Sequence, residues 1–309
     1  MISEELPAAL DGERLDRIVA LLADVSRSMA VTVIEAGAVR VNGDVAVSGK
    51  SRLATGASVE IDPTAITEPE PPSADESVVF DIVHVDDSVI VIDKPAGLVV
   101  HPGAGNREGT LVSGLLAKFP DIEGVGAPER PGIVHRLDAG SSGLLVVART
   151  VEAAEALIAQ FADHSAGRRY SALVWGHPAA LHGIIDSPIG RNPGDPLKMA
   201  LVVDGRAART EYEVVERLYA PADVALLTCR LQTGRTHQIR VHLTGIGHPL
   251  VGDNTYGDRR TSLGLTRPFL HAAELSFNHP DTGVRVTFGS ALPDDLADLL
   301  ATLERAQPQ

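Results

Sequence analysis

A charged segment between two apolar runs holds the residues best placed to do chemistry. It contains His135, Arg136 and Asp138, followed by Gly140 and Gly143. The two glycines permit a tight turn with close backbone approach. An aspartate has a reference pKa of about 3.9, so Asp138 is ionised at neutral pH without help from a base. Such a carboxylate could act as a nucleophile, a proton acceptor or a metal ligand. The simplest alternative is that it caps a turn and pairs with Arg136.

Three histidines form a second candidate group. His237, His242 and His248 lie close together in the sequence, so a metal-dependent hydrolase is one alternative function. Histidine is a common zinc ligand, but no cysteine or carboxylate completes the set at ligand spacing. We therefore expect these histidines to form hydrogen bonds, and we expect no metal site.

The charge distribution bears on the partner of the protein. The chain of 309 residues carries 27 basic and 41 acidic side chains, a net charge of −14. This excess of acid argues against a simple nucleic-acid binder, which normally carries a basic surface. Residues 1–75 hold 6 basic and 13 acidic side chains, whereas residues 168–240 hold 10 basic and 7 acidic ones. The second segment is rich in arginine, which suits bidentate phosphate contacts.

Cysteine content and hydropathy limit the cellular compartments in which the protein is expected. Cys229 is the only cysteine, which excludes an internal disulfide and fits a reducing compartment. No apolar run approaches the ~18 residues that a membrane span needs. The N-terminus lacks the apolar core of a signal peptide. We expect a cytoplasmic protein without membrane contact.

Length and composition predict two domains. A small α/β unit over residues 13–62 has helical apolar spacing at 13–22 and 29–36, and an Asn-Gly hairpin signal at 39–45. Residues 63–77 are rich in proline and acidic residues and predict a linker.

The remaining residues, 78–309, form the second predicted domain. Strands outnumber helices there, which favours an α+β fold whose mainly antiparallel mixed sheet is flanked by helices. The predicted strands cover 78–85, 89–92, 144–148, 170–175, 211–217 and 224–231. The predicted helices cover 110–119, 151–164 and 291–306.

Five segments of this domain together resemble the RluA/RluD-type family of pseudouridine synthases. Residues 132–149 contain His-Arg-Leu-Asp, then Ser-Ser-Gly and an apolar strand, which resembles the family's signature around its catalytic aspartate. Residues 231–243 resemble the family's Leu-x-Thr-Gly-Arg-Thr-His-Gln-Ile-Arg-Val-His motif. The other three matches are Lys-Pro-x-Gly with Val-His at 94–101, basic-Tyr-x-Ala-x-Val-x-Gly at 169–176, and Gly-His-Pro-x-x-Gly-Asp at 247–253.

The resemblance implies roles for single residues and no metal or cofactor. Asp138 is the implied catalytic residue, Tyr170 stacks on the target base, and Arg240 pairs with Asp138, with Arg235 as the alternative partner. The implied substrate-binding residues are His135, Arg136, Arg168, Arg169, Arg235 and Lys94. A polar loop adds Arg259, Arg260 and Arg267 as candidate phosphate contacts.

The small N-terminal unit has a resemblance of its own. Its order of Arg-Leu-Asp, Ser-Arg and Gly-x-Val-x-Val-Asn-Gly resembles the αL RNA-binding domain of small-subunit ribosomal proteins, which many pseudouridine synthases also carry. This implies RNA docking through Arg27 and Arg40. In the simpler alternative, both arginines are only solvated surface residues.

Taken together, the resemblances imply an RNA pseudouridine synthase, an isomerase that converts specific uridines to pseudouridine. The expected substrate is the 23S rRNA of the large ribosomal subunit, met as a pre-ribosomal particle by a monomeric enzyme. The alternatives are a synthase for tRNA or another rRNA site, and a catalytically silent RNA-binding assembly factor. The presence of Asp138, Tyr170 and Arg240 argues against the silent factor.

Overall fold

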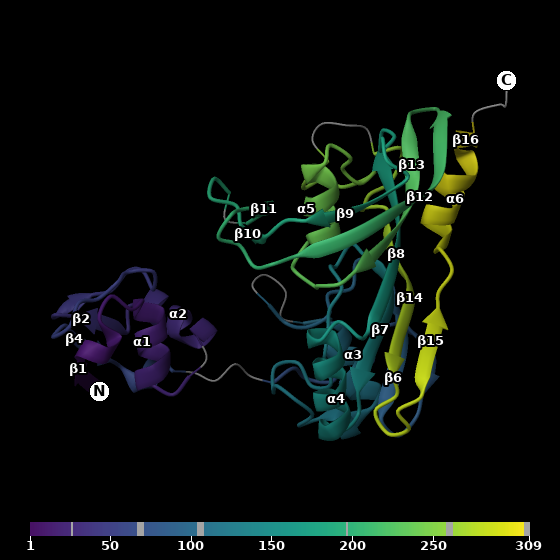
Figure 1. Ribbon diagram of the computed structural model, residues 1–309. Helices are drawn as coiled ribbons and strands as arrows, with labels where there is room; N and C mark the ends of the chain where they lie inside the picture. The colour runs from purple at the N-terminus through teal and green to yellow at the C-terminus, as the bar shows by residue number, and fades with distance from the viewer. Residues whose placement is uncertain (26, 67–70, 104–107, 196, 258–261, 306–309) are drawn as a thin grey trace. The chain divides into compact units, whose positions relative to one another are not determined.

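A computed structural model of the chain describes residues 1–25, 27–66, 71–103, 108–195, 197–257 and 262–305. Contacts divide the chain into two units, Met1–Glu70 and Pro71–Gln309, each with a hydrophobic core of its own (Figure 1). The predicted linker begins with a 3-10 helix, η2 (Pro63–Ala65). Its residues 67–70 lie outside the described part of the chain.

The small unit combines two helices with a four-stranded antiparallel sheet of order β1-β4-β2-β3. The helices are α1 (Leu15–Leu22) and α2 (Arg27–Glu35), preceded by the 3-10 helix η1 (Ala8–Leu10). The strands are β1 (Ile2–Glu5), β2 (Val39–Val41), β3 (Asp44–Val45) and β4 (Ser58–Ile61).

Local sequence explains most of this unit. Leu15, Ile18 and Val19 lie on one face of α1 and are buried, as their helical spacing predicts. Asn42 and Gly43 have φ of 52° and 88°, which a two-residue hairpin turn requires. The structure therefore contains the predicted helices and hairpin. The expected start of the unit omits β1, which pairs with β4, because the sequence Ile-Ser-Glu-Glu has no apolar alternation.

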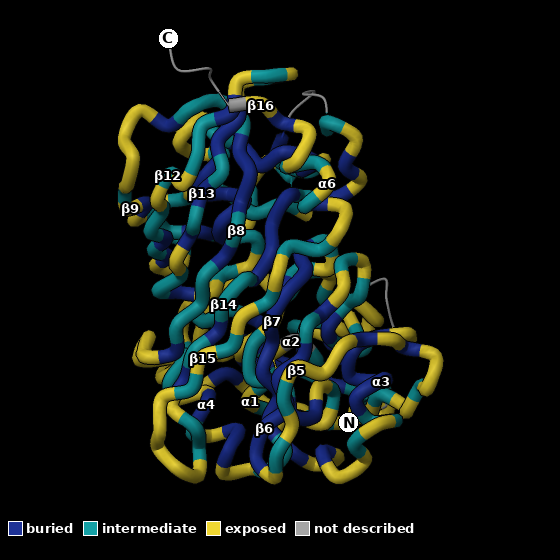
Figure 2. The backbone as a smooth tube through the Cα atoms, turned by 90° about the vertical axis from the view of Figure 1, so that its right-hand side faces the viewer, coloured by how far each residue is buried: buried dark blue, intermediate teal, exposed yellow. Residues whose placement is uncertain are grey.

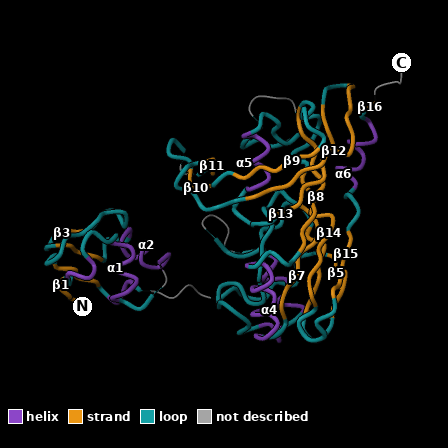
Figure 3. The backbone as a smooth tube through the Cα atoms, viewed as in Figure 1, coloured by secondary structure: helices purple, strands orange, loops and turns teal. Residues whose placement is uncertain are grey.

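The large unit is built on a ten-stranded sheet. Its main path has the order β16-β12-β13-β8-β14-β7-β6-β5, while β9 pairs with β12 and β15 with β14. Within the described strands, only β7 and β14 pair in parallel, so the sheet is mixed and mainly antiparallel, as predicted. The strands lie side by side along the whole unit (Figure 3). Their bounds are β5 (Asp81–Val85), β6 (Val89–Lys94), β7 (Ser142–Ala148), β8 (Gly167–Trp175), β9 (His182–Asp186), β12 (Arg209–Ala220), β13 (Val224–Leu231), β14 (Leu270–Asn278), β15 (Arg285–Gly289) and β16 (Glu304–Arg305).

Helices and a separate hairpin complete the large unit. Thr110 and Thr150 cap the helices that follow them, because their side chains accept hydrogen bonds from the N–H groups of Ser113 and Ala153. Over the described residues, no helix has both the length and the apolar character that a membrane crossing demands. The helices are α3 (Leu111–Lys118), α4 (Val151–Ala162), α5 (Gln238–Gly245) and α6 (Asp294–Thr302), with the 3-10 helix η3 (Pro120–Ile122). The hairpin consists of β10 (Ile189–Arg191) and β11 (Met199–Leu201).

Strand β7 is the centre of the core. All of its residues are buried, and it appears dark blue along its length in Figure 2. Leu145 and Val147 pack in one cluster with side chains of α3, whereas Leu144 and Val146 pack in another with side chains of α4. Alternate residues of a strand point to opposite faces, so β7 is covered on both faces. The turn that carries Asp138 leads directly into this rigid strand.

Candidate active site

The turn from Asp138 to β7 is shaped by close backbone approach. The Ser141 N–H donates to the Asp138 carbonyl oxygen at 3.0 Å. Gly143 has φ of 111°, and a Cβ atom there would lie 2.4 Å from the Ala272 carbonyl oxygen. Only glycine fits this position, which lets β7 pair with β14 directly after the turn. The carboxylate of Asp138 is thereby anchored to the centre of the sheet.

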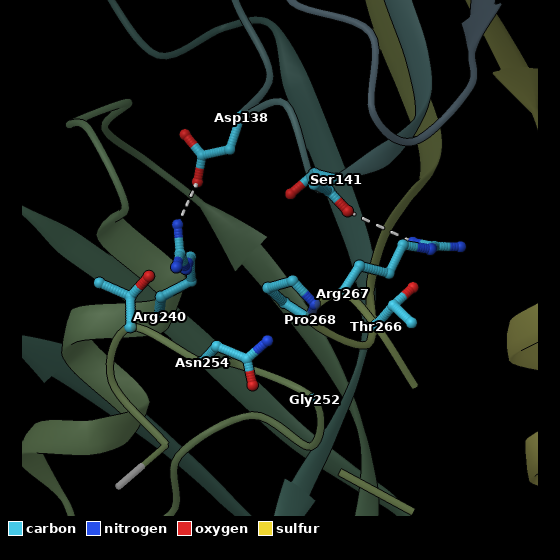
Figure 4. Close-up of a pocket in the computed structure, with 10 residues that line it drawn as sticks. Asp138, Ser141, Arg240, Gly252, Asn254, Thr266, Arg267 and Pro268 are labelled. Carbon is cyan, nitrogen blue, oxygen red and sulfur yellow. Dashed lines mark hydrogen bonds and ion pairs between the residues drawn. The ribbon is translucent and has the colours of Figure 1, made fainter. Parts of the chain in front are cut away.

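Arg240 lies between two carboxylates. Its Nη1 is 3.6 Å from Asp138 Oδ2, as the dashed line in Figure 4 shows. Its Nε and Nη2 donate to Asp253 Oδ2 and Oδ1 at 2.7 and 2.8 Å. Burial opposes ionisation of Asp253. The hydrogen bonds and charge of Arg240, together with the N–H groups of Thr255 and Tyr256, outweigh it and lower the Asp253 pKa. The structure thus brings Arg240, and not Arg235, to Asp138.

The start of α5 is fixed by a buried glutamine. Gln238 Oε1 accepts hydrogen bonds from Thr233 Oγ1 at 2.7 Å and from the Arg235 N–H at 3.0 Å. Gln238 Nε2 donates to Thr210 Oγ1 at 2.9 Å on the neighbouring strand β12. Buried side chains that satisfy one another in this way specify a single geometry. The Thr-Gly-Arg-Thr-His-Gln motif therefore orients the helix that carries Arg240.

Two cavities meet at the Asp138–Arg240 pair. Asp138, Ser141 and Arg240 line both of them. The smaller cavity, of about 240 Å³, is lined on one side by Thr266, Arg267 and Pro268 (Figure 4). The larger one, of about 500 Å³, is lined by Tyr170. Concave sites with a few convergent polar groups are the usual places of ligand binding in proteins.

The larger cavity is strongly basic. Arg136, Arg168, Arg206 and Arg235 line it, and none of the four has an ion-pair partner within the described residues. Asp138 is the only acidic residue in its described lining. Guanidinium groups without carboxylate partners favour the binding of phosphate groups. The chain is acidic as a whole, but this cavity is positive.

Tyr170 lies on the cavity face of β8. Its side chain is largely buried, and burial raises its pKa to about 12. The phenol therefore remains protonated at neutral pH, so it offers a flat ring and an O–H donor beside Asp138. Both properties suit a base that has left its stack.

Lys94 differs from its expected role as a direct substrate ligand. It is fully buried, and its Nζ donates to the carbonyl oxygens of Pro95, Leu98 and Ala139 at 2.8, 2.9 and 3.3 Å. An ammonium group has three donors, so none is left for a substrate. Burial lowers the Lys94 pKa to about 7, although the Asp138 carboxylate opposes this shift. Lys94 supports the turn that carries Asp138 and does not face the cavity.

Arg169 also differs from its expected role. It is the neighbour of Arg168 on β8, and successive side chains of a strand point to opposite faces. Arg169 Nη2 is 2.6 Å from Glu274 Oε2 on β14, and Arg169 is not part of the cavity lining. Alternation therefore separates the two arginines that the sequence places together.

His135 lies at the edge of the larger cavity. Its ring packs on Phe161 with centroids 4.5 Å apart, and its Nε2 accepts a hydrogen bond from the Val146 N–H at 3.0 Å. Burial lowers its pKa to about 3, so the ring is neutral at neutral pH. Its Nδ1, which then carries the proton, has no partner within the described part of the chain. Arg136, its neighbour, is exposed at the cavity.

The three histidines of the hydrolase alternative have separate partners. His237 Nδ1 bonds with Tyr256 Oη at 2.8 Å, His242 Nδ1 with Thr210 Oγ1 at 2.9 Å, and His248 Nδ1 with the Trp175 carbonyl at 2.8 Å. In the portion of the chain that the structure describes, no three His, Cys, Asp or Glu residues are grouped to hold a metal ion. The described histidines thus offer no ligand set for a metal-dependent hydrolase.

The two candidate RNA-docking arginines of the small unit are both exposed. Arg27 Nη2 donates to Asp16 Oδ1 at 3.1 Å, and Arg14 shares the same buried carboxylate. Arg40 Nη1 donates to the Gly43 carbonyl at 2.9 Å, at the tip of the hairpin. Arg27 is therefore partly committed to its own domain.

The sequence analysis assigned no role to two important residues of the site, and a third residue differs from its expected role. Asp253 lies in a Gly-Asp segment that has no sign of its ion pair, and Arg206 belongs to no recognised motif. Arg267 was expected in a polar loop, but only 9% of it is exposed, and its Nε and Nη2 donate to Asp295 at 2.7 Å. The neighbouring loop candidates Arg259 and Arg260 lie outside the described residues.

Comparisons with known proteins agree with this geometry. The model of the RNA pseudouridylate synthase family matches residues 88–244, and that of the S4 domain matches residues 13–59. An uncharacterized RNA pseudouridine synthase of Bacillus subtilis, YlyB, is 42% identical over 297 residues, 95% of each chain. The ribosomal large subunit pseudouridine synthase D of Zymomonas mobilis is 42% identical over 308 residues, 94% of each chain.

A solved structure supports the same assignment. Human RNA Pseudouridylate Synthase Domain Containing 1 is 29% identical, with a TM-score of 0.59, over 74% of this chain and 89% of the human chain. The resemblances of both domains are thereby confirmed. The chain belongs to the RNA pseudouridylate synthase family and carries an N-terminal S4 domain.

Proposed function

We propose that the protein isomerises specific uridines of 23S rRNA, in the large ribosomal subunit, to pseudouridine. The observation that carries the proposal is the Asp138–Arg240 ion pair beside Tyr170 in an arginine-lined cavity. The substrate is supported by relatives whose names specify the large ribosomal subunit. In this proposal the enzyme acts in the cytoplasm as a monomer, on the rRNA or its pre-ribosomal particle.

The reaction exchanges one glycosidic bond for another. The bond between uracil N1 and ribose C1′ breaks, and a bond between C5 and C1′ forms. C5 loses its proton and N1 gains one, so atoms balance within the substrate. The uridine first leaves its stack, at a cost of a few kcal/mol that is smaller in a loop than in a duplex.

Each cavity residue has a proposed part in this exchange. Asp138 abstracts the 2′ proton to give a glycal, or attacks C1′ or C6 to form a covalent intermediate. Arg240 holds the Asp138 carboxylate in place through their ion pair, in which Nη1 lies 3.6 Å from Oδ2. Tyr170 stacks on the detached uracil and keeps it in the cavity. Arg136 helps to displace the base from its stack.

Replacement of Asp138 by asparagine tests the proposal. The variant keeps the shape of the side chain and removes its charge, so pseudouridine formation should be abolished while folding and RNA binding persist. Tritium release from 5-tritiated uridine in 23S rRNA measures turnover. Asp121→Asn is the control, because Asp121 is an exposed carboxylate paired with Arg149 at 2.7 Å.

The size of the loss decides the result. A loss of activity of about tenfold or less corresponds to about 1.4 kcal/mol or less in the activation barrier. Such a loss is too small for the central catalyst and would refute the assignment of this role to Asp138. Site-resolved pseudouridine mapping in a strain that lacks the protein identifies the RNA. Missing modifications in tRNA alone would favour the tRNA alternative, and an unchanged map would favour the silent assembly factor.

A further inference from the structure

Three arginines from separate elements meet in the larger cavity. Arg168 comes from β8, Arg206 from the segment between β11 and β12, and Arg235 from the loop before α5. Two of them also contact the backbone of a residue next to another of the three. Arg235 Nε donates to the carbonyl oxygen of Ala207, next to Arg206, at 2.9 Å. Arg168 Nη1 lies against Gly234, next to Arg235.

The side chain of Arg168 is held in place by its surroundings. A Cβ atom at Gly234 would lie 2.6 Å from Arg168 Nη1, so the absence of a side chain there makes room for the guanidinium group. Arg168 Cζ is 5.3 Å from the centre of the Phe161 ring, within range of a cation–π contact. Arg168 Nε is buried and has no hydrogen-bond partner among the described residues. The protein therefore does not satisfy all the donors of this guanidinium group.

Arg206 is held through its backbone. Its N–H donates to the Ile189 carbonyl oxygen at 2.9 Å, and the Ile189 N–H donates to the Arg206 carbonyl oxygen at 3.0 Å. A Cβ atom at Gly205 would lie 2.7 Å from the backbone of Ile189, so glycine permits this close approach. The β10–β11 hairpin thus presents Arg206 to the cavity from a fixed point.

The charges of the three arginines are not balanced by the protein. None of the three has a carboxylate partner within the described residues, and the pKa of Arg235 is lowered by burial and by Arg206 and Arg168. Like charges that converge without a counter-ion raise the free energy of the empty site. An anion with two neighbouring acceptor oxygens would relieve this repulsion, because each guanidinium group can donate two parallel hydrogen bonds to it.

We propose that Arg168, Arg206 and Arg235 form a binding site for one phosphodiester group of the RNA strand that delivers the target uridine. The inference rests on the proposed function, because it takes the ligand of the cavity to be RNA. Such a contact fixes the register of the strand without reading its sequence. Asp138 lines the same cavity, so this phosphate lies near the nucleotide whose base enters it.

The test distinguishes a binding site of defined geometry from nonspecific electrostatic attraction of RNA. Gly234→Ala keeps every charge of the protein but pushes Arg168 from its position, and the atom it meets is the end of a flexible side chain, so the fold should persist. Arg206→Gln removes one cation, and Arg206→Lys keeps the charge without the fork. Arg230→Gln is the control, because Arg230 is exposed and lies 3.8 Å from Glu213.

Binding of a short single-stranded oligouridylate to the full chain is measured over a range of salt concentrations. Arg206→Gln should weaken binding about fivefold or more at low salt and make the log–log salt slope less steep by about 0.7, the loss of one phosphate contact. Gly234→Ala should weaken binding at least about threefold without a change in net charge. Arg206→Lys should fall between Arg206→Gln and the wild type, and Arg230→Gln should match the wild type.

Two results would overturn the site. In the first, Gly234→Ala and Arg206→Gln bind as tightly as Arg230→Gln. In the second, all variants including Arg230→Gln weaken equally, which indicates diffuse attraction. The assay involves no turnover, so its outcome is separate from that of Asp138→Asn. A phosphate site without pseudouridine formation would contradict only the proposed function.

Discussion

Asp253 binds Arg240 through both carboxylate oxygens, and this contact leaves only Nη1 of Arg240 near Asp138. The Tyr256 ring lies 5.0 Å from Arg240 Cζ and restricts the guanidinium further. A planar group held at two nitrogens by one carboxylate has a fixed direction for the third. The orientation of Asp138 therefore depends on a second aspartate that does not line the larger cavity.

Asp253→Asn should reduce turnover while RNA affinity is retained. The change removes the charge that holds Arg240 and leaves a buried cation with a weaker partner, which costs about 3 kcal/mol in unfolding free energy. We expect single-turnover rates to fall at least tenfold, about 1.4 kcal/mol in the barrier. Denaturant unfolding and tritium release measure the two effects.

Glu213→Gln serves as the control for Asp253→Asn. Glu213 pairs with Arg230 at 3.8 Å and is exposed, so its removal should change stability by less than about 1 kcal/mol and leave turnover unchanged. An Asp253→Asn enzyme with full turnover would show that Asp138 does not need a fixed Arg240.

Arg267 supports the catalytic turn from the other side. It is bound by Asp295 at the start of α6, and its Nη1 donates to the Gly140 carbonyl at 3.4 Å and to Ser142 Oγ at 3.3 Å. Arg267→Met should therefore lower kcat about tenfold with little change in KM, since the turn loses a support but the RNA surface remains. Rate measurements at several RNA concentrations separate kcat from KM.

Arg149→Met is the matched control for Arg267. Arg149 forms a similar ion pair with Asp121 at 2.7 Å, away from both cavities. Arg149→Met should lower the free energy of unfolding without lowering kcat. A raised KM with unchanged kcat in Arg267→Met would instead show that Arg267 contacts RNA, as its sequence position first suggested.

The pKa of His135 predicts a loss of stability in mild acid. Burial lowers the pKa of His135 from 6.5 to about 3 in the folded state. Between these values the unfolded chain binds a proton that the folded chain does not, so stability falls as pH decreases through this window. The slope for one such group reaches about 1.4 kcal/mol per pH unit.

His135→Gln isolates this contribution. Glutamine keeps an acceptor for the Val146 N–H but does not titrate, so the variant should lose about 2 kcal/mol less stability than the wild type between pH 7 and pH 5. Urea unfolding at both pH values provides the comparison. The control is His182→Gln on the exposed part of β9, which should behave like the wild type. Equal pH slopes for His135→Gln and the wild type would contradict the prediction.

The sequence was most informative where the local pattern decides the structure. The strand after Asp138 is apolar on both faces, and it forms the buried strand β7. Thr110 and Thr150 begin the helices at the predicted places because their hydroxyl groups cap them. The terminal helix ends at Thr302, earlier than its apolar pattern suggests, because the chain then pairs with β12 as β16.

Residues whose role depends on long-range contacts could not be placed in this way. The adjacent Arg168 and Arg169 look equivalent in the sequence. Their side chains point to opposite faces of β8, and deciding which one faces the cavity requires the register of the strand. Lys94 lies in a motif that implies substrate binding, but three carbonyl oxygens from two turns far apart in the chain enclose its ammonium group. Asp253 ends the Gly-His-Pro-x-x-Gly-Asp match and Arg206 belongs to no motif. The sequence assigns neither residue a role, because their contacts come from other elements.

Removal of the small domain tests whether it docks RNA. The cut belongs after residue 70, because the Asp75 N–H donates to the Ser113 carbonyl at 2.9 Å and belongs to the large unit. The large unit has its own core, so the truncated protein should fold. It should bind rRNA more weakly and choose sites less strictly, yet retain turnover on a minimal stem-loop, because every proposed catalytic residue lies in the large unit.

The size and salt dependence of this loss follow from the charges of the small domain. Arg27 and Arg40 are exposed, but residues 1–75 hold 13 acidic and only 6 basic side chains, so the loss of affinity should be modest and should shrink as salt rises. The double variant Arg27→Gln with Arg40→Gln in the full chain should reproduce much of the loss. Unchanged rRNA affinity and unchanged site choice at low salt would show that this S4 domain is not an RNA-docking module.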